Sequence, residues 1–195
     1  PVKHTALGRF KHEAGNVHVT EDGTVVCYSG DDSRFEYIYK FVSTKKYKEG
    51  DIEHNLTILD HGTLYVAKVG AGFSLDPQAA AAPLTWIKLG SATSNEIRAL
   101  AASLKPQQIM DVRTTDPQDA TFTKVAANGA IEWIKLVPGM EKAAAFLETH
   151  RYASLVGASM GFTKMEGTTV NAKDKIAYSA LQNCQSSMVA GNALN

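Results

Sequence analysis

The chain has 195 residues, 44% of them hydrophobic and 21% charged, which is an ordinary composition for a globular protein. Its 20 basic and 20 acidic residues leave no net charge, so no overall field attracts an anionic membrane, and no nucleic-acid partner is expected. No apolar stretch reaches the roughly 18–20 residues that a membrane-spanning helix needs, and the first residues lack the pattern of a secretory signal peptide.

The first 70 residues predict a series of short strands. Asp22-Gly23 separates two β-branched runs, which is a strong signal for a hairpin. A turn is expected at 30–34 and a charged surface loop at 45–54. The expected strands cover residues 17–20, 24–28, 35–42, 56–59 and 62–68. Short strands at such close spacing favour a sandwich, a barrel or a propeller.

Residues 70–130 have a different pattern and are expected to form an insertion of helices and loops on the β scaffold. Thr93 and Glu96 have the spacing of a capping box, and apolar residues follow at helical intervals. Asp116-Pro117 is a second expected helix start. Thr85–Leu89 and Glu132–Leu136 resemble one another, and both are interpreted as amphipathic strands.

The last third of the chain predicts a helix and then a second hairpin. Residues 138–150 are rich in alanine and begin with a proline, which is typical of a helix. Two β-rich runs follow, at 169–171 and 175–179, with a turn at 172–174 between them. The prediction for the whole chain is one domain, 1–195, that is mostly β with short helical insertions.

The two expected hairpins resemble each other, and a glutamate precedes each of them. Glu13 leads through a short polar gap to the first hairpin, and Glu166 leads in the same way to the second. Such self-similarity is expected of propeller blades, so the sequence predicts a partial β-propeller that belongs to a larger one. Equivalent residues at the starts of inner strands converge on the mouth of the central channel.

Two glutamates that converge in this way repel each other unless a cation or a shared proton lies between them. Carboxylates are hard oxygen ligands, suited to Ca²⁺, Mg²⁺, Mn²⁺ or ferric iron. The alternative is that Glu13 and Glu166 are exposed loop carboxylates with no ligand. The repeat by itself leaves both interpretations open.

The two cysteines give little information about function. Cys27 lies in an apolar β-rich run and is interpreted as a small buried hydrophobic residue. Cys184 follows a similar run far along the chain. Two distant cysteines match neither a zinc pattern nor a disulfide framework, although a single bridge between them stays open.

Several motifs, in order, resemble the PhoX-type alkaline phosphatases, which are secreted or periplasmic β-propeller enzymes of bacteria. The resemblance is dense over residues 8–70 and returns around 143–192. The motifs that carry it are Gly8-Arg9-Phe10-Lys11-His12-Glu13-Ala14, Tyr28-Ser29-Gly30-Asp31-Asp32-Ser33-Arg34, Glu36-Tyr37-Ile38-Tyr39-Lys40-Phe41-Val42 and Leu59-Asp60-His61-Gly62-Thr63-Leu64-Tyr65-Val66-Ala67-Lys68.

The resemblance implies hydrolysis of phosphate monoesters by a cluster of Ca²⁺ and Fe³⁺ ions. It implies that Glu13 and Glu166 are metal ligands, and Asp31 and Asp32 are further candidates, although Gly-Asp-Asp-Ser is also a good turn sequence. Lys164 stands where the family usually has an arginine that contacts phosphate. It is therefore the candidate catalytic and substrate-binding residue, but it lacks the bidentate fork of arginine.

The resemblance also implies that this chain is an interior or C-terminal piece of a longer periplasmic or secreted protein, because the family is several hundred residues long. The piece is expected to have little activity alone and to associate through open strand edges or with the rest of the propeller. Two alternatives stay open: a non-catalytic calcium-binding or interaction module on a propeller scaffold, and a propeller hydrolase acting on lactones or phosphotriesters.

Overall fold

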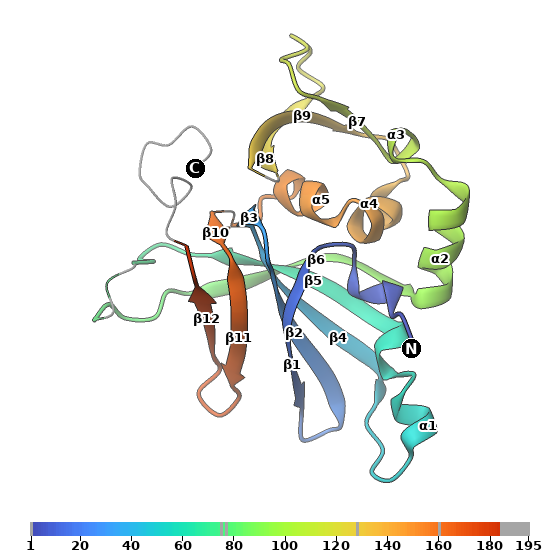
Figure 1. The fold of residues 1–195 in the computed structure, drawn as a ribbon, viewed down its shortest axis with the longest axis vertical. Helices are drawn as coiled ribbons and strands as arrows, with labels where there is room; N and C mark the ends of the chain where they lie inside the picture. The colour runs from blue at the N-terminus through green and yellow to red at the C-terminus, as the bar shows by residue number, and fades with distance from the viewer. Residues whose placement is uncertain (1, 75, 77, 128, 160, 184–195) are drawn as a thin grey trace.

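A computed structural model describes residues 2–74, 76, 78–127, 129–159 and 161–183. Its largest element is a five-stranded antiparallel sheet in the order β1-β2-β4-β5-β6 (Figure 1). Chain order and sheet order agree, so this sheet is a meander. Its strands are β1 (His12–Val19), β2 (Thr24–Asp31), β4 (Ile38–Lys46), β5 (His61–Val69) and β6 (Leu84–Thr93).

The first hairpin forms as predicted, and its turn explains why. Gly23 has φ +84°, a conformation that favours glycine. One carboxylate oxygen of Asp22 accepts hydrogen bonds from the Thr20 hydroxyl at 2.6 Å and from the Thr24 amide at 3.1 Å. The turn thereby fixes the pairing of Val19 with Val25, and with it the register of β1 on β2.

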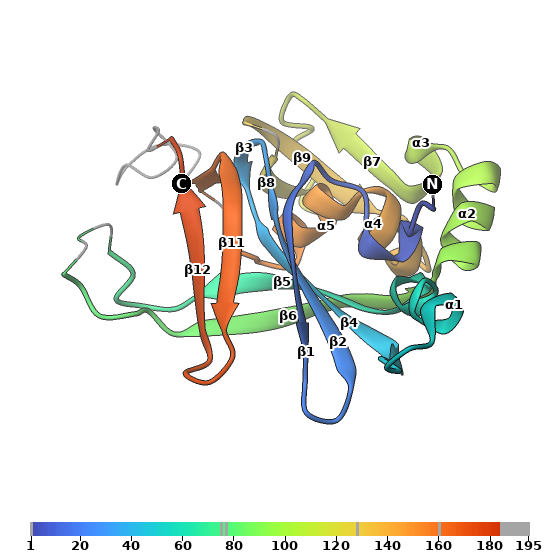
Figure 2. The same ribbon diagram turned by 60° about the horizontal axis from the view of Figure 1, so that its bottom comes forward.

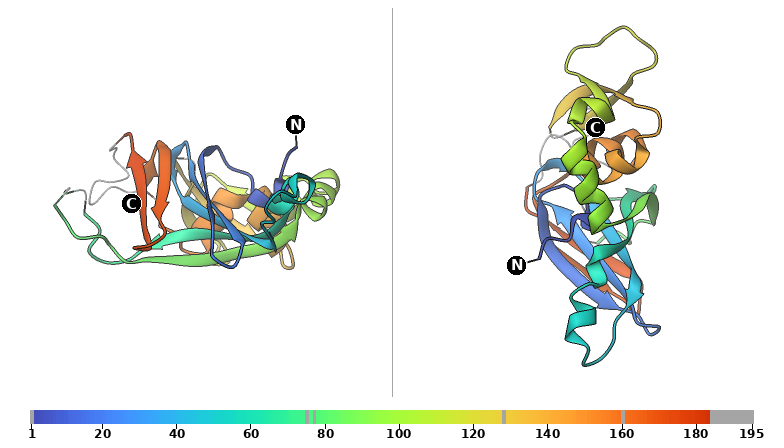
Figure 3. Two further views of the ribbon diagram at one scale, coloured as in Figure 1. Left: turned by 90° about the horizontal axis from the view of Figure 1, so that it is seen from below. Right: turned by 90° about the vertical axis from the view of Figure 1, so that its right-hand side faces the viewer.

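A helical layer separates the five-stranded sheet from a second sheet of three strands (Figures 1 and 3). The second sheet has the order β7-β9-β8. Helix α2 runs along one side of the molecule and connects the two sheets. These elements are α2 (Ser94–Ser103), α3 (Pro106–Ile109), β7 (Met110–Arg113), β8 (Thr123–Ala127), β9 (Ala130–Leu136), α4 (Glu141–Leu147) and α5 (Thr149–Leu155).

Helix α4 contributes to two hydrophobic cores at once because its side chains are small. Ala145 and Phe146 pack toward the five-stranded sheet, whereas Ala143 and Ala144 pack toward the three-stranded sheet. Gly90 of β6 permits the close approach, since a Cβ there would lie 3.1 Å from the Phe146 ring. Burial on both sides requires a helix without polar residues on those faces, and the alanine run supplies it.

The second hairpin, β11 (Met165–Asn171) and β12 (Ile176–Leu181), lies beside β1 and β2 (Figures 1 and 2). The two hairpins with similar sequences are therefore neighbours in space. A short pair of strands, β3 (Arg34–Glu36) and β10 (Phe162–Thr163), joins the two regions. A third apolar cluster lies at this junction and comprises Ile38, Ala67, Phe162 and Met165.

The capping box at Thr93 is confirmed. The Thr93 hydroxyl accepts a hydrogen bond from the Glu96 amide at 3.2 Å, and the Glu96 carboxylate accepts one from the Thr93 amide at 2.7 Å. Glu96 also pairs with Lys142 at 2.9 Å, which links α2 to α4. The predicted strands around Trp86 and Trp133 are confirmed as parts of β6 and β9.

Five local predictions were wrong or incomplete. Residues 56–59 are not a strand; they lead into a 3-10 turn, η2 (Ile58–Asp60), after the short helix α1 (Ile52–Asn55). No helix starts at Asp116, because Asp116 and Asp119 each accept a hydrogen bond from the backbone amide two residues on, which makes turns.

The expected turn at 30–34 is shorter than predicted, since Gly30 and Asp31 continue β2 and Arg34 begins β3. The expected helix 138–150 starts at Glu141 and divides into α4 and α5 at Glu148, where φ −124° and ψ 45° are not helical. The range 70–130 carries α2 and α3, but it also carries β6, a strand of the five-stranded sheet.

The described sheets are open at both edges, and the chain is mostly β with several antiparallel sheets. No helix among the described residues is long and apolar enough to cross a membrane. Cys27 is half-buried beside the main core, and Cys184 lies outside the described residues.

Gly30→Ala tests the contact between the two hairpins. A Cβ at Gly30 would lie 2.6 Å from the Met165 carbonyl oxygen, which is backbone and cannot move aside. We expect a loss of about 1–3 kcal/mol in the free energy of unfolding, measured by urea denaturation. Gly15→Ala is the matched control, because nothing lies within 4 Å of a Cβ at that position. Equal stability of the two variants would contradict the prediction.

Candidate functional site

The candidate site lies where the open end of hairpin β1–β2 meets the start of β11. Met165 packs on Gly30, so the backbones of β11 and β2 are in contact. The residues on either side of Met165 are Lys164 and Glu166, and Asp31 follows Gly30. The glycine therefore sets the distance between the two sequence segments that were predicted to share a site.

Lys164 joins two of the predicted ligands. Its ammonium lies 3.1 Å from Asp32 Oδ1 and 3.0 Å from Glu166 Oε1. The structure thus brings together three predicted site residues that lie up to 134 positions apart in the sequence. Hydrogen bonding to Glu166, and then to Asp32, raises the pKa of Lys164, so this side chain is a cation at neutral pH.

The main chain of Lys164 is held independently of its side chain. Its amide donates to the Ser33 carbonyl oxygen at 3.0 Å, and its carbonyl oxygen accepts from the amides of Glu166 at 3.1 Å and Gln182 at 3.2 Å. The backbone of Lys164 has φ +54°, which is uncommon for a residue other than glycine. These bonds hold the residue in the left-handed region.

Asp31 lies beneath this ion-paired surface. It is 3% exposed, and its amide donates to the Tyr37 carbonyl oxygen at 3.2 Å. Within the described part of the chain, its Oδ1 atom is buried without a hydrogen-bond partner. Burial raises the pKa of Asp31 to about 7, although the nearby Lys11 opposes the shift.

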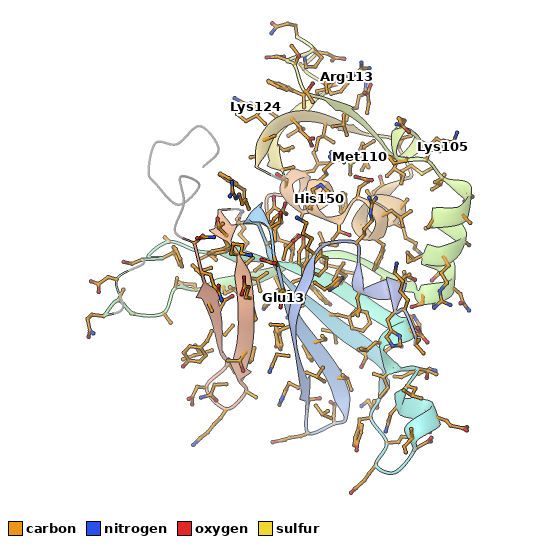
Figure 4. All side chains as sticks on the ribbon, viewed as in Figure 1. Glu13, Lys105, Met110, Arg113, Lys124 and His150 are labelled. Carbon is orange, nitrogen blue, oxygen red and sulfur yellow. The ribbon has the colours of Figure 1, made fainter. Side chains whose placement is uncertain are left out.

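Glu13 is exposed on β1, where it is paired with Gly30 of β2. The strand is irregular directly after it, with a shift of register between Glu13 and Asn16 and with φ +50° at Ala14. Figure 4 places Glu13 between β1 and β11. Across the described ranges, the Glu13 carboxylate makes no ion pair.

The predicted metal ligands share one end of the hairpins but do not form a closed cage. In the part of the chain that the structure describes, no three His, Cys, Asp or Glu side chains are grouped to hold a metal ion. Asp32 and Glu166 do share one cation position, which Lys164 fills. Their oxygens and the unpartnered Asp31 Oδ1 are the donor type that hard cations prefer, yet Ca²⁺ takes six to eight oxygens. The donor chemistry fits a hard cation, and further ligands are needed.

Sequence reasoning missed two contributors to this site. Lys11 has its carbonyl oxygen bonded to the Asp32 amide at 2.9 Å, and its ammonium lies 3.4 Å from the Ser33 hydroxyl. Tyr39 is fully buried, and burial raises the pKa of its hydroxyl, with Asp31 adding to the shift. Lys11 belongs to the Lys-His-Glu motif around Glu13, so the motif was the signal that could have found it.

A second charged cluster has a structural role. Arg151 donates two hydrogen bonds to Glu132, at 2.8 and 3.0 Å, and one to Glu148 at 2.8 Å. Arg9 donates to the same Glu148 at 3.3 Å. These pairs connect β9, α5 and the segment before β1. The bidentate geometry and the burial of both glutamates make this cluster a strong connection between layers.

His12 supports the same end of β1. Its ring nitrogen Nε2 lies 3.0 Å from the Gly8 carbonyl oxygen, and its ring lies 3.6 Å from that of Phe10. His12 therefore makes local contacts with the segment before β1 and takes no part in the Lys164 cluster. Arg34 is exposed in β3, in keeping with its interpretation as a surface residue.

A groove of about 1340 Å³ is lined by residues of hairpin β11–β12 and of the five-stranded sheet. Trp86, Tyr28 and Phe162 are among the aromatic residues that line it. The Lys40 ammonium lies 4.4 Å from the centre of the Trp86 ring, a cation–π arrangement. The Lys164 cluster is not part of this lining.

The chain is mostly β, and its candidate site gathers two carboxylates around a lysine. Residues 1–194 match the family described as alkaline phosphatase PhoX. The chain belongs to the PhoX alkaline phosphatase family, which confirms the resemblance found in the sequence.

A solved structure supports this assignment. The chain is similar to PhoX of Pseudomonas fluorescens, solved in complex with vanadate, a transition state analogue, with 31% identity and a TM-score of 0.64. The similarity covers 98% of this chain and 26% of that one, so the chain spans about a quarter of its relative. A search of curated proteins found no match.

The raised pKa of Asp31 predicts an unusual dependence of stability on pH. A carboxyl group with a folded pKa near 7 and an unfolded value of 3.8 takes up a proton on folding at pH between these values. In metal-free protein, this group therefore makes the fold less stable as pH rises from about 4 to about 7. Asp31→Asn is expected to remove that contribution.

The measurement is urea denaturation of wild type and Asp31→Asn, in chelator, between pH 5 and pH 8. The readout is the difference in unfolding free energy between the two proteins at each pH. Burial lowers the pKa of His12 and His150, which makes the fold more stable as pH rises, opposite to the effect of Asp31. Both proteins share this histidine contribution, so it cancels in the difference. Glu21→Gln, at the exposed turn of the first hairpin, is the control. Parallel curves for wild type and Asp31→Asn would show that the Asp31 pKa is ordinary.

Proposed function

We propose that this chain is part of a metal-dependent phosphatase that hydrolyses phosphate monoesters. The observation that carries the proposal is the Lys164 cluster, in which one cation joins carboxylates from two hairpins at their shared end. Membership of the PhoX family and similarity to an enzyme that binds vanadate support it. The activity belongs to the whole protein, of which this chain is one part.

Glu13, Asp31, Asp32 and Glu166 are the residues that would hold metal ions, and we propose Ca²⁺ and Fe³⁺ as those ions. When bound, such ions neutralise phosphate oxygens and lower the pKa of a bound water. Carboxylates from β1, from the end of β2 and from β11 would contribute to one centre, because Gly30 and Met165 hold these segments in contact. The remaining ligands would come from other parts of the protein.

Lys164 is the residue proposed to act on the phosphate. Its ammonium is a compact charge on a four-carbon side chain, and it would stabilise the equatorial oxygens of the phosphoryl group electrostatically. Lys11 adds a second positive charge at the same end of the hairpins. Both would favour a dianionic monoester over a neutral ester.

We also propose that the two hairpins belong to blades of a larger β-propeller. The support is their similar sequence, their side-by-side position and the open sheet edges of the described chain. Edges of this kind would pair with the rest of the protein or with another chain. A periplasmic or secreted location is proposed from the resemblance to the family.

Glu13→Gln and Glu166→Gln test the phosphatase proposal in the full-length protein. Each change removes one negative charge and one hard ligand, so phosphatase activity with Ca²⁺ present should fall about tenfold or more. Turnover of p-nitrophenyl phosphate is the readout, and Glu21→Gln in the exposed turn is the control. Near-normal rates in both variants would remove these glutamates from the site.

The isolated 195-residue chain is expected to turn over little or no p-nitrophenyl phosphate, because the described residues supply too few ligands for a closed metal site. Robust metal-dependent turnover by the isolated chain would contradict this expectation.

Metal analysis of the full-length protein separates the proposed phosphatase from a simple binding module. Iron together with calcium supports the phosphatase, whereas calcium alone or no metal supports a module without catalysis.

A further inference from the structure

The Lys164 ammonium lies between the carboxylates of Asp32 and Glu166. Its distances of 3.1 Å to Asp32 and 3.0 Å to Glu166 are those of direct ion pairs. The same two oxygens are candidate ligands of the proposed metal site. A metal ion held by these two carboxylates would therefore compete with Lys164 for them.

The side chain of Lys164 can leave this position without disturbing the fold. It is 36% exposed, so one side already faces solvent. The three backbone hydrogen bonds of Lys164 involve its amide and carbonyl groups only. Rotation about the side-chain bonds moves the ammonium while the contacts to Ser33, Glu166 and Gln182 stay in place.

The exchange reverses the charge of the site. Asp32, Glu166 and Lys164 together carry one net negative charge, which repels a phosphate anion. A divalent ion held by the two carboxylates would neutralise them and leave the ammonium of Lys164 unpaired. The same three residues with the ion then carry one net positive charge, which attracts a phosphate anion.

We propose that Lys164 is a resident counter-cation that the metal ion displaces, and that its release makes anion binding depend on prior metal binding. The inference rests on the proposed function, because both the metal ion and the phosphate are the ones proposed there. It adds an order of events: metal first, then lysine release, then substrate. Because coupling between two ligands is reciprocal, phosphate should also raise the affinity for the metal.

The experiment measures Ca²⁺ binding by isothermal titration calorimetry with metal-free, full-length protein at low, constant ionic strength. Lys164→Met removes the competing cation. Exposed ion pairs contribute about 0.2–1 kcal/mol each, so loss of two should tighten Ca²⁺ binding about two- to thirtyfold. Lys173→Met, in the exposed turn of hairpin β11–β12, removes the same charge nearby and should leave the affinity within about twofold.

Inorganic phosphate is the second probe. Wild type should bind phosphate measurably more tightly with Ca²⁺ present than without it, and Lys164→Met should lose most of that gain. Lys164→Asn is a second variant that protects against misfolding, because asparagine tolerates the left-handed backbone at this position. Both variants should show tighter Ca²⁺ binding and weaker phosphate coupling.

Unchanged or weaker Ca²⁺ binding in both Lys164 variants would overturn the proposal. Phosphate binding that is independent of Ca²⁺ in wild type would overturn it as well. These results are separate from the phosphatase test: Glu13→Gln and Glu166→Gln can abolish turnover while the Lys164 variants leave Ca²⁺ affinity unchanged. Conversely, tighter Ca²⁺ binding by the Lys164 variants, together with no turnover by the wild-type protein, would support the counter-cation and reject the enzyme.

Discussion

The contact of Gly30 with Met165 is the constraint on which the candidate site depends. It places the backbone of β11 against β2, and only a residue without a Cβ permits this distance. Lys164 and Glu166 flank Met165, and Asp31 and Asp32 follow Gly30. A shift of the two backbones by the size of a methyl group would therefore separate Lys164 from Asp32, even though neither residue takes part in the contact.

Asp31 and Asp32 are adjacent in sequence but differ in environment because they lie at the end of a strand. Asp31 is the last residue of β2 and is buried, so its carboxyl group is desolvated and its pKa is raised. Asp32 lies beyond the strand and meets the Lys164 ammonium. Burial raises the pKa of the first carboxyl group, whereas the outer position places the second beside a cation.

Features that depend on neighbouring residues were predicted well from the sequence. The Asp22-Gly23 turn and the Thr93–Glu96 capping box have chemistry that is complete within four residues. The helix expected at Asp116 failed for a related reason: an aspartate that can cap a helix can equally close a turn on its own backbone, as Asp116 does with Gln118.

The arrangement of the site required the structure. Glu166, Lys164 and Asp32 were each singled out from motifs, but no local rule places a lysine between two carboxylates from distant segments. Asp31 is buried near Tyr37 and Tyr39, and its charge adds to the raised pKa of both tyrosines; the strand pattern alone does not bring these residues together. The family resemblance supplied the residue types, and the tertiary contacts supplied their pairing.

The backbone of the candidate site has left-handed conformations at Ala14 and Lys164. Outside glycine, the described residues with positive φ are Ala14, Phe35, Gln118, Lys164 and Lys175. Two of these five belong to the candidate site: Ala14 follows Glu13, and Lys164 carries the ammonium.

Each such residue costs on the order of 1–2 kcal/mol, so it persists only where surrounding contacts determine its conformation. The bonds from Ser33 and Gln182 do this for Lys164. A backbone fixed at this cost, with a side chain left free at its end, is what an exchange between lysine and metal requires. The carboxylates stay in place for either cation, and only the ammonium has to move.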